Sequence, residues 1–115
     1  MQVASSQLPR CYLVTRHPGA IKWLEHKGIR AECVEHFDPA VLRPGDVVIG
    51  ILPVHLVAEA CKRGASYLHL AVDVPRQMRG KEIPADMLDR FNARLVSYQC
   101  SESDINDPHF AGAFS

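Results

Sequence analysis

The stretch DVVIGILPVHLVAEACKRGASYLHLAVD, residues 46–73, decides the fold. Its first part, residues 46–52, is almost entirely apolar and does not alternate, which is typical of a strand covered on both faces. Residues 54–63 follow with helical periodicity, and Gly64 is placed to end that helix. Residues 67–72 are a second apolar run. A strand, a helix and a strand joined by short turns predict a βαβ unit with parallel strands.

The same pattern precedes this stretch. Residues 11–15 predict a strand, residues 18–27 a helix that ends at Gly28, and residues 31–37 a less buried strand at the sheet edge. Asp-Pro at the start of residues 38–42 predicts a short helical turn. Together these elements predict a three-layer α/β domain with a mostly parallel sheet of about four strands, in the order 2-1-3-4.

The last predicted element is a helix over residues 84–99. Its apolar residues Leu88, Phe91, Leu95 and Tyr98 recur at spacings of 3, 4 and 3. We expect residues 11–100 to form one domain. Residues 1–10 are predicted to be a flexible leader and residues 101–115 a polar tail that frays or docks loosely.

Composition excludes several classes of protein. The chain has 115 residues and a formal net charge of zero, which argues against stable, non-specific DNA binding. No apolar run is long enough to span a membrane, and no signal peptide is evident, so we expect a cytoplasmic protein. The four cysteines form no CxxC pair, and three of them fall inside apolar strand or helix patterns, which favours free thiols that pack as small hydrophobes. No phosphate-loop, dinucleotide or HExxH motif occurs, and we expect neither a cofactor nor a metal ion.

Ligands of open parallel sheets bind beyond the carboxyl ends of the strands, a place we call the carboxyl edge. Three predicted strands end there, and the loops that follow them carry many cationic and imidazole side chains. These are Arg16, His17, His55, Arg76, Arg79 and Lys81, against the single acid Asp73. Two helices also begin at this edge, and their free N–H groups favour anions. The pattern predicts a phosphate-bearing ligand, with arginine making forked contacts.

We assign ligand binding to residues in and beside these loops. They are Thr15, Pro18, Gly19, Gly50, Leu52, Pro53, Asp73, Arg76, Arg79 and Lys81. Structural roles remain open for several candidates: Arg16, His17 and His55 as exposed side chains, and Asp73 as a cap of its loop. His69 lies inside an apolar strand, which is more typical of a hydrogen-bonded core histidine. Trp23 is predicted to serve in packing or in a subunit contact.

Four segments resemble a family of small CRISPR-associated proteins encoded beside type III interference systems. They are VTRHPGAI (14–21), LRPGDVVIG (42–50), LPVHL (52–56) and RGASYLHL (63–70), and the resemblance covers roughly residues 11–98. That family is placed among the ring nucleases. The resemblance implies a small Rossmann-like (CARF-like) and usually dimeric protein. It implies that the protein binds cyclic oligoadenylate, above all cyclic tetra-adenylate, and cleaves it without metal to switch off the antiviral response.

The chemistry of such a reaction fits the predicted edge. The ribose 2′-OH next to an RNA-type phosphodiester can attack it in line, so the protein must align the groups, stabilise charge and protonate the leaving 5′-oxygen. We predict catalytic roles for Arg16, His17 and His55, with Arg16 and Arg76 as phosphate holders and one of the two histidines as the acid or base. Two other functions stay open: a protein that sequesters the messenger without cutting it, and an adaptor subunit of an interference complex.

Overall fold

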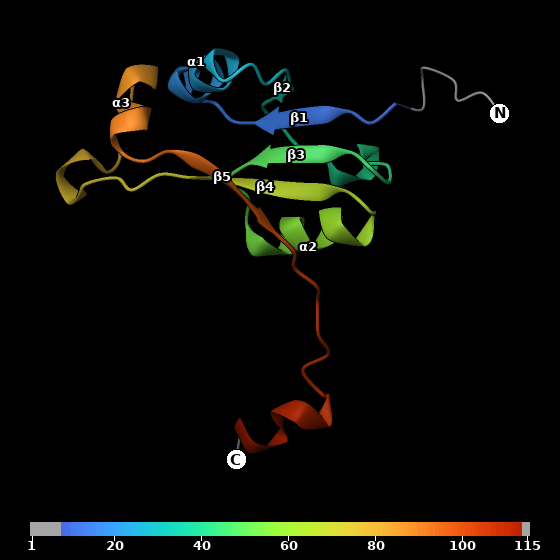
Figure 1. The fold of residues 1–115 in the computed structure, drawn as a ribbon. Coiled ribbons are helices and arrows are strands. Elements are labelled where there is room, and N and C mark those ends of the chain that lie inside the picture. The colour runs from blue at the N-terminus through green and yellow to red at the C-terminus, as the bar shows by residue number, and fades with distance from the viewer. Residues whose placement is uncertain (1–7, 114–115) are drawn as a thin grey trace.

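The computed structural model describes residues 8–113 and contains a five-stranded sheet (Figure 1). The strands are β1 (Cys11–Val14), β2 (Glu32–Val34), β3 (Val47–Gly50), β4 (Ser66–Ala71) and β5 (Arg94–Tyr98). They lie in the order β2-β1-β3-β4-β5; the first four are parallel, and β5 is antiparallel to β4. The predicted α/β class and the order of the first four strands are therefore confirmed.

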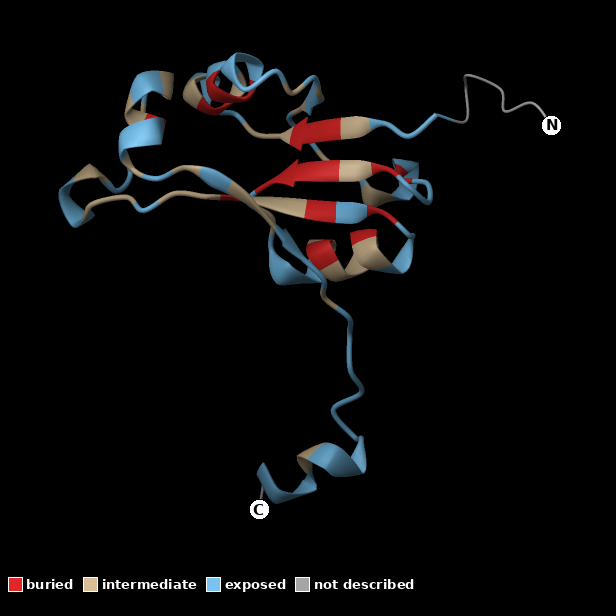
Figure 2. Ribbon diagram, viewed as in Figure 1, coloured by how far each residue is buried: buried red, intermediate tan, exposed pale blue. Residues whose placement is uncertain are grey.

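Helices cover both faces of this sheet. On one face lie α1 (Pro18–His26) and α3 (Ala85–Arg90), and on the other lie α2 (Val54–Lys62) and the 3₁₀ turn η2 (Pro39–Val41) (Figure 1). Alternate residues of each strand point to opposite faces. Leu13 and Ile49 consequently join the core under α1 and α3, whereas Val48 joins the core under α2. Buried residues gather on the strands and the inner helix surfaces (Figure 2), so the predicted three layers are confirmed.

All three α-helices end in the same way. Gly28 and Gly64 have φ angles of 77° and 85°, and the two residues that follow each helix donate backbone hydrogen bonds into its last turn. Such an ending requires a left-handed residue, which glycine adopts without steric cost. The predicted ends of the first two helices are confirmed.

The predicted helix over residues 84–99 is wrong in its second half. The helix α3 stops at Arg90, and Asn92 takes the left-handed φ of 58°. Its N–H and that of Ala93 bond the carbonyls of Asp89 and Leu88 at 3.1 and 2.9 Å, which closes the helix as glycine does elsewhere. The chain then forms β5, an unpredicted fifth strand. The apolar stripe predicted over residues 84–99 has helical spacing, but the residues of its second half also fit a strand. The spacing alone therefore did not distinguish the two structures.

A single buried carboxylate organises the amino ends of two strands. Asp46 is 3 % exposed, and its two oxygens accept hydrogen bonds from the backbone N–H groups of Arg10 and Arg43, each at 2.9 Å. The first bond holds the entry to β1 and the second closes the turn before β3. Strands β1 and β3 are thereby aligned in the register that places their carboxyl ends side by side.

Helix α1 also contacts α3 through Trp23. This residue is 4 % exposed, and its indole N–H donates to Asp89 at 2.9 Å, while Lys27 lies 3.2 Å from the same carboxylate. These hydrogen bonds lower the pKa of Asp89. The bond from Trp23 is the largest cause, and the bond from Lys27 is the next largest. The packing role predicted for Trp23 is confirmed.

The ends of the chain differ from the body. Residues 1–7 of the predicted leader lie outside the described residues. Residues after Cys100 leave the sheet as an exposed arm that ends in the 3₁₀ segment η4 (Pro108–Ala113) (Figures 1 and 2). The four cysteines are free thiols, and Cys33 is exposed rather than packed. None of the helices between residues 8 and 113 has the length and apolar character needed to cross a membrane.

Candidate ligand site at the carboxyl edge

The strand order contains one reversal, between β1 and β3. From β1 the chain crosses over one face through α1, and from β3 it crosses over the other face through α2. Such a reversal leaves a crevice at the carboxyl edge, where open α/β sheets bind ligands. Gly50 ends β3 there, and a Cβ atom on it would lie 2.8 Å from the carbonyl oxygen of Val14. Glycine thus allows the ends of the two strands to approach closely.

The turn after β1 holds the first predicted catalytic residues. The Thr15 hydroxyl accepts a hydrogen bond from the backbone N–H of His17 at 3.1 Å, and Pro18 occupies the first position of α1. Arg16 and His17 are both exposed. The His17 ring is not isolated, because its Nδ1 lies 3.3 Å from a carboxylate oxygen of Glu82. Glu82 was not predicted; the 65 residues that separate the pair in sequence gave no signal of the contact.

The long loop of residues 72–84 extends beyond the carboxyl edge (Figure 1). Its outer part is the 3₁₀ turn η3 (Arg76–Met78), and its return passes close to α1, where a Cβ atom on Gly19 would collide with the carbonyl of Ile83. The ionic contact of Glu82 and this close approach place the second half of the loop beside the turn after β1. Gly19 is therefore a packing position between the two.

The cations of this edge are largely unpaired. Within residues 8–113, no carboxylate forms an ion pair with any of four exposed side chains, namely Arg16, Arg76, Arg79 and Lys81. The ion pairs found within the described residues involve other basic side chains, namely His17, Lys27, Arg63 and Arg94. Exposed positive charges without internal partners are available to an anionic ligand.

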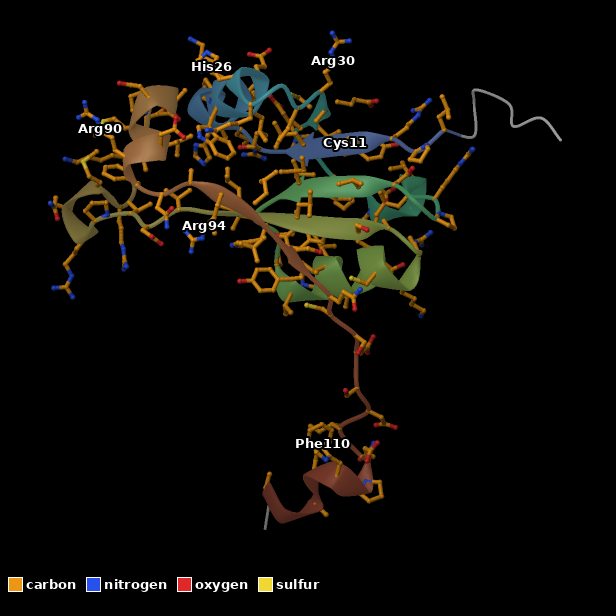
Figure 3. All side chains as sticks on the ribbon, viewed as in Figure 1. Cys11, His26, Arg30, Arg90, Arg94 and Phe110 are labelled. Carbon is orange, nitrogen blue, oxygen red and sulfur yellow. The ribbon has the colours of Figure 1, made fainter. Side chains whose placement is uncertain are left out.

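Asp73, for which both ligand binding and a role as cap of its loop were predicted, supports the start of this loop, and ligand binding stays a prediction. Its carboxylate accepts hydrogen bonds from Asn92 at 3.0 Å and from Arg94 at 3.4 Å, and its N–H donates to the carbonyl of Phe91 at 2.8 Å. The Asn92 bond and the charge of Arg94 lower the pKa of Asp73. Arg94 begins β5 and pairs with Ala71 at the carboxyl end of β4 (Figure 3). It was missed because β5 was predicted as helix.

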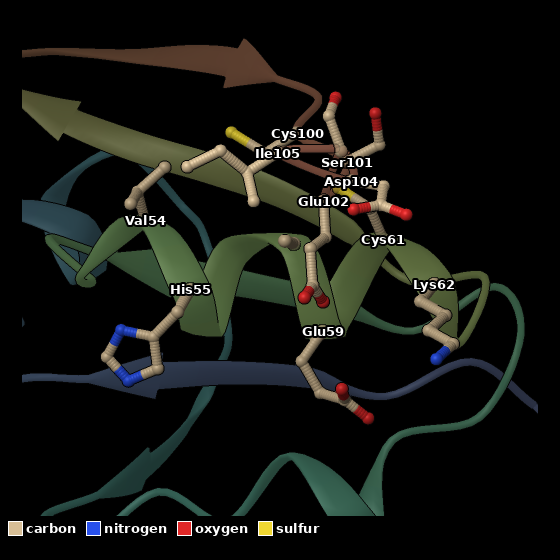
Figure 4. Close-up of a pocket in the computed structure, with 12 residues that line it drawn as sticks. Val54, His55, Glu59, Cys61, Lys62, Cys100, Ser101, Glu102, Asp104 and Ile105 are labelled. Carbon is tan, nitrogen blue, oxygen red and sulfur yellow. The ribbon is translucent and has the colours of Figure 1, made fainter. Parts of the chain in front are cut away.

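His55 and His17 lie on opposite faces of the sheet. His55 occupies the first turn of α2, on the face opposite α1, and lines a groove between α2 and residues 100–105 (Figure 4). The groove also carries the carboxylates Glu59, Glu102 and Asp104 and a single lysine, Lys62. That balance of charge disfavours a phosphate ligand. Neither a hydrogen bond nor an ion pair joins His55 to His17 in the described structure, so a catalytic role for His55 stays a prediction.

Leu52 and Pro53, predicted to contact ligand, follow β3 in a turn that a neighbouring strand supports. The hydroxyl of Tyr67, on β4, lies 3.0 Å from both the carbonyl oxygen of Gly50 and the N–H of Leu52. The same hydroxyl lies 2.7 Å from Nδ1 of His69. His69 is hydrogen-bonded, as predicted, but it is half-buried and sits opposite Gly50 in the register. Sequence reasoning overlooked Tyr67; alternate polar side chains in an apolar strand were the available signal.

The family model described as "Putative CRISPR-associated protein (Cas_VVA1548)" matches residues 12–101. The chain belongs to this CRISPR-associated family. The matched range includes the carboxyl edge, loop 72–84 and β5. Searches of curated proteins and of solved structures found no match to the chain.

Proposed function

We propose that this CRISPR-associated protein is a ring nuclease. It binds a cyclic oligoadenylate, with cyclic tetra-adenylate as the preferred ring, and cleaves it without a metal ion to end type III antiviral signalling. Membership of the family and the resemblance of its motifs to ring nucleases support the ligand class. The geometry of the carboxyl edge supports the location.

One observation carries the proposal: the unpaired cations Arg16, Arg76, Arg79 and Lys81 on the loops of the carboxyl edge of a chain with zero net charge. A neutral protein with exposed cations on the loops of one edge selects a compact polyanion rather than a long nucleic acid. Cyclic oligoadenylate offers several phosphates within a small ring. Arginine suits them because its fork donates two parallel hydrogen bonds to one phosphate.

The cleavage uses groups of the ligand and of the turn after β1. The ribose 2′-oxygen forms a bond to the adjacent phosphorus and loses its proton to water, while the bond from phosphorus to the 5′-oxygen breaks. Arg16 and Arg76 hold the phosphate and stabilise its developing charge. His17, in its imidazolium form, gives a proton to the leaving 5′-oxygen. Glu82 beside Nδ1 orients the ring so that Nε2 performs this transfer.

The ring symmetry of the ligand suits a two-fold dimer, in which each subunit presents the same edge to half of the ring. Two apolar residues that follow β3 are largely exposed: Ile51 at 65 % and Val54 at 70 %. Exposed apolar side chains beside a binding edge are typical of an interaction surface. They support a second copy of the chain as the partner.

The test incubates the purified protein with cyclic tetra-adenylate and cyclic hexa-adenylate, with and without EDTA, and separates the products by chromatography. We expect linear adenylates that end in a 2′,3′-cyclic phosphate, formed equally fast in EDTA and faster from the tetra-adenylate. A ligand that co-elutes intact with the protein would instead make it a sponge. Absence of binding to both rings would leave only the adaptor function.

A further inference from the structure

The turn after β3 is held by a side chain from the neighbouring strand. Tyr67 is 2 % exposed, and its hydroxyl bridges the carbonyl oxygen of Gly50 and the N–H of Leu52, each at 3.0 Å. The register pairs Tyr67 with Val48, so the ring extends along the sheet to reach a turn two residues further on. A buried hydroxyl costs free energy unless it is hydrogen-bonded. Phenylalanine would fill the same volume in the core, so packing alone does not require the hydroxyl. The contacts of the hydroxyl are with the turn, and its role is to support that turn.

The partners of the Tyr67 hydroxyl determine whether His69 donates or accepts a hydrogen bond. The Tyr67 hydroxyl has one proton and two lone pairs. The N–H of Leu52 donates to it, and the carbonyl of Gly50 can only accept, so the proton points to Gly50. The nitrogen of His69 at 2.7 Å must then be the donor, with its proton on Nδ1. All three bonding positions of the hydroxyl are filled.

The turn is thereby restricted from two sides. On the β1 side, the backbone of Val14 approaches so closely that only glycine fits at position 50. On the β4 side, the Tyr67 hydroxyl bridges the turn through two hydrogen bonds, and His69 is hydrogen-bonded to that hydroxyl. Between the bridged residues lies Ile51, which is exposed. The restricted turn borders the crevice between β1 and β3, where the phosphate ligand of the proposed reaction would lie.

We propose that Tyr67 and His69 are positioning residues, which fix the turn of residues 50–53 in the geometry that aligns a bound cyclic oligoadenylate for cleavage. This inference rests on the proposed function. In-line attack depends on alignment within about 1 Å, so a turn that loses its bridge slows cleavage more than it weakens binding.

The decisive variant is Tyr67→Phe, which removes the hydroxyl and keeps the ring. We expect the single-turnover cleavage rate of cyclic tetra-adenylate to fall at least about tenfold, with a dissociation constant changed by less than about threefold. Tyr98→Phe is the matched control, because Tyr98 stacks edge-on against His69 with its ring and is half exposed. Its rate should equal that of the unaltered protein.

His69 provides a second, independent variant. His69→Leu removes the donor and should slow cleavage as Tyr67→Phe does, whereas His69→Gln keeps an N–H donor and should restore part of the rate. The double variant Tyr67→Phe/His69→Leu should be no slower than Tyr67→Phe alone, because His69 acts on the turn only through the Tyr67 hydroxyl. Additive losses, or equal losses of rate and affinity, would overturn the positioning role.

Amide hydrogen exchange at Leu52 separates this inference from the proposed function. Exchange should be faster in Tyr67→Phe and unchanged in Tyr98→Phe, whether or not the protein cleaves any ligand. Unchanged exchange at Leu52 in Tyr67→Phe would refute the bridge itself. Faster exchange in a protein that cleaves no cyclic oligoadenylate would refute the proposed function and, with it, the link to cleavage.

Discussion

Asp73 shows how a single residue prepares the carboxyl edge before any ligand binds. Its carboxylate accepts hydrogen bonds from Asn92 and Arg94, which ties the end of β4 to the start of β5. We expect a pKa below the ordinary value of 3.8, and Asn92→Ala should raise it because the Asn92 bond is the largest cause. NMR measures the pKa of Asp73 in both proteins. The carboxyl chemical shifts are followed over the range in which carboxyl groups titrate, roughly pH 2 to 7.

The sign of the linked stability follows from that direction. Folding lowers the pKa, so the interaction stabilises the folded protein above the ordinary value of 3.8 and is lost as the pH falls through the lowered one. In Asn92→Ala this acid-side loss should be smaller and should end at a higher pH, because the folded-state pKa then lies closer to the ordinary value. A pKa of Asp73 at or above 3.8 in the unaltered protein would contradict the account.

Another residue-scale prediction concerns the buried carboxylate at the opposite end of the sheet. Asp46→Ala removes the acceptor of two backbone N–H groups, at Arg10 and Arg43, and should lower the free energy of unfolding by about 3 kcal/mol. Asp38 is the matched control, since it is exposed and accepts one N–H, from Ala40. Asp38→Ala should cost about 1 kcal/mol. Urea unfolding followed by the fluorescence of Trp23 compares them, and equal losses would contradict the assigned role.

At the scale of elements, what the sequence allowed to be predicted depends on how local the signal is. The unalternating apolar strands β3 and β4 and the glycines that end α1 and α2 are local patterns, and they predicted these elements correctly. The end of α3 depends on Asn92 in a left-handed conformation, which asparagine tolerates but does not require. Strand β5 depends on pairing with β4 across 22 or more intervening residues. No periodicity within residues 84–99 reveals that pairing.

The candidate site was likewise predictable only in part. The carboxyl edge and its cations were predictable, because parallel strands bring their ends together whatever the side chains do. The partners of those side chains were not, since the contacts of His17 with Glu82 and of Asp73 with Arg94 join segments 65 and 21 residues apart. The opposite placements of His17 and His55 follow from the reversal between β1 and β3. They became evident only with the helices placed on their faces.

At the scale of the whole molecule, the exposed apolar residues Ile51 and Val54 predict the oligomeric state. The double variant Ile51→Glu/Val54→Glu should sediment as a monomer and bind cyclic tetra-adenylate at least about tenfold more weakly, because charge is costly in an apolar interface. Val41→Glu, at a valine of η2 that is 52 % exposed, is the control and should remain a dimer. An unaltered protein that sediments as a monomer at every concentration would refute the dimer.

The central claim is that the unpaired cations of the carboxyl edge carry the cleavage. Its most direct test is the single-turnover rate of cyclic tetra-adenylate cleavage, with protein in excess and EDTA present. Arg16→Ala should lower the rate about a hundredfold, through loss of charge stabilisation at the reacting phosphate. Arg30→Ala, at an exposed arginine between α1 and β2, should leave it unchanged. Cleavage by Arg16→Ala at the rate of the unaltered protein would contradict the account.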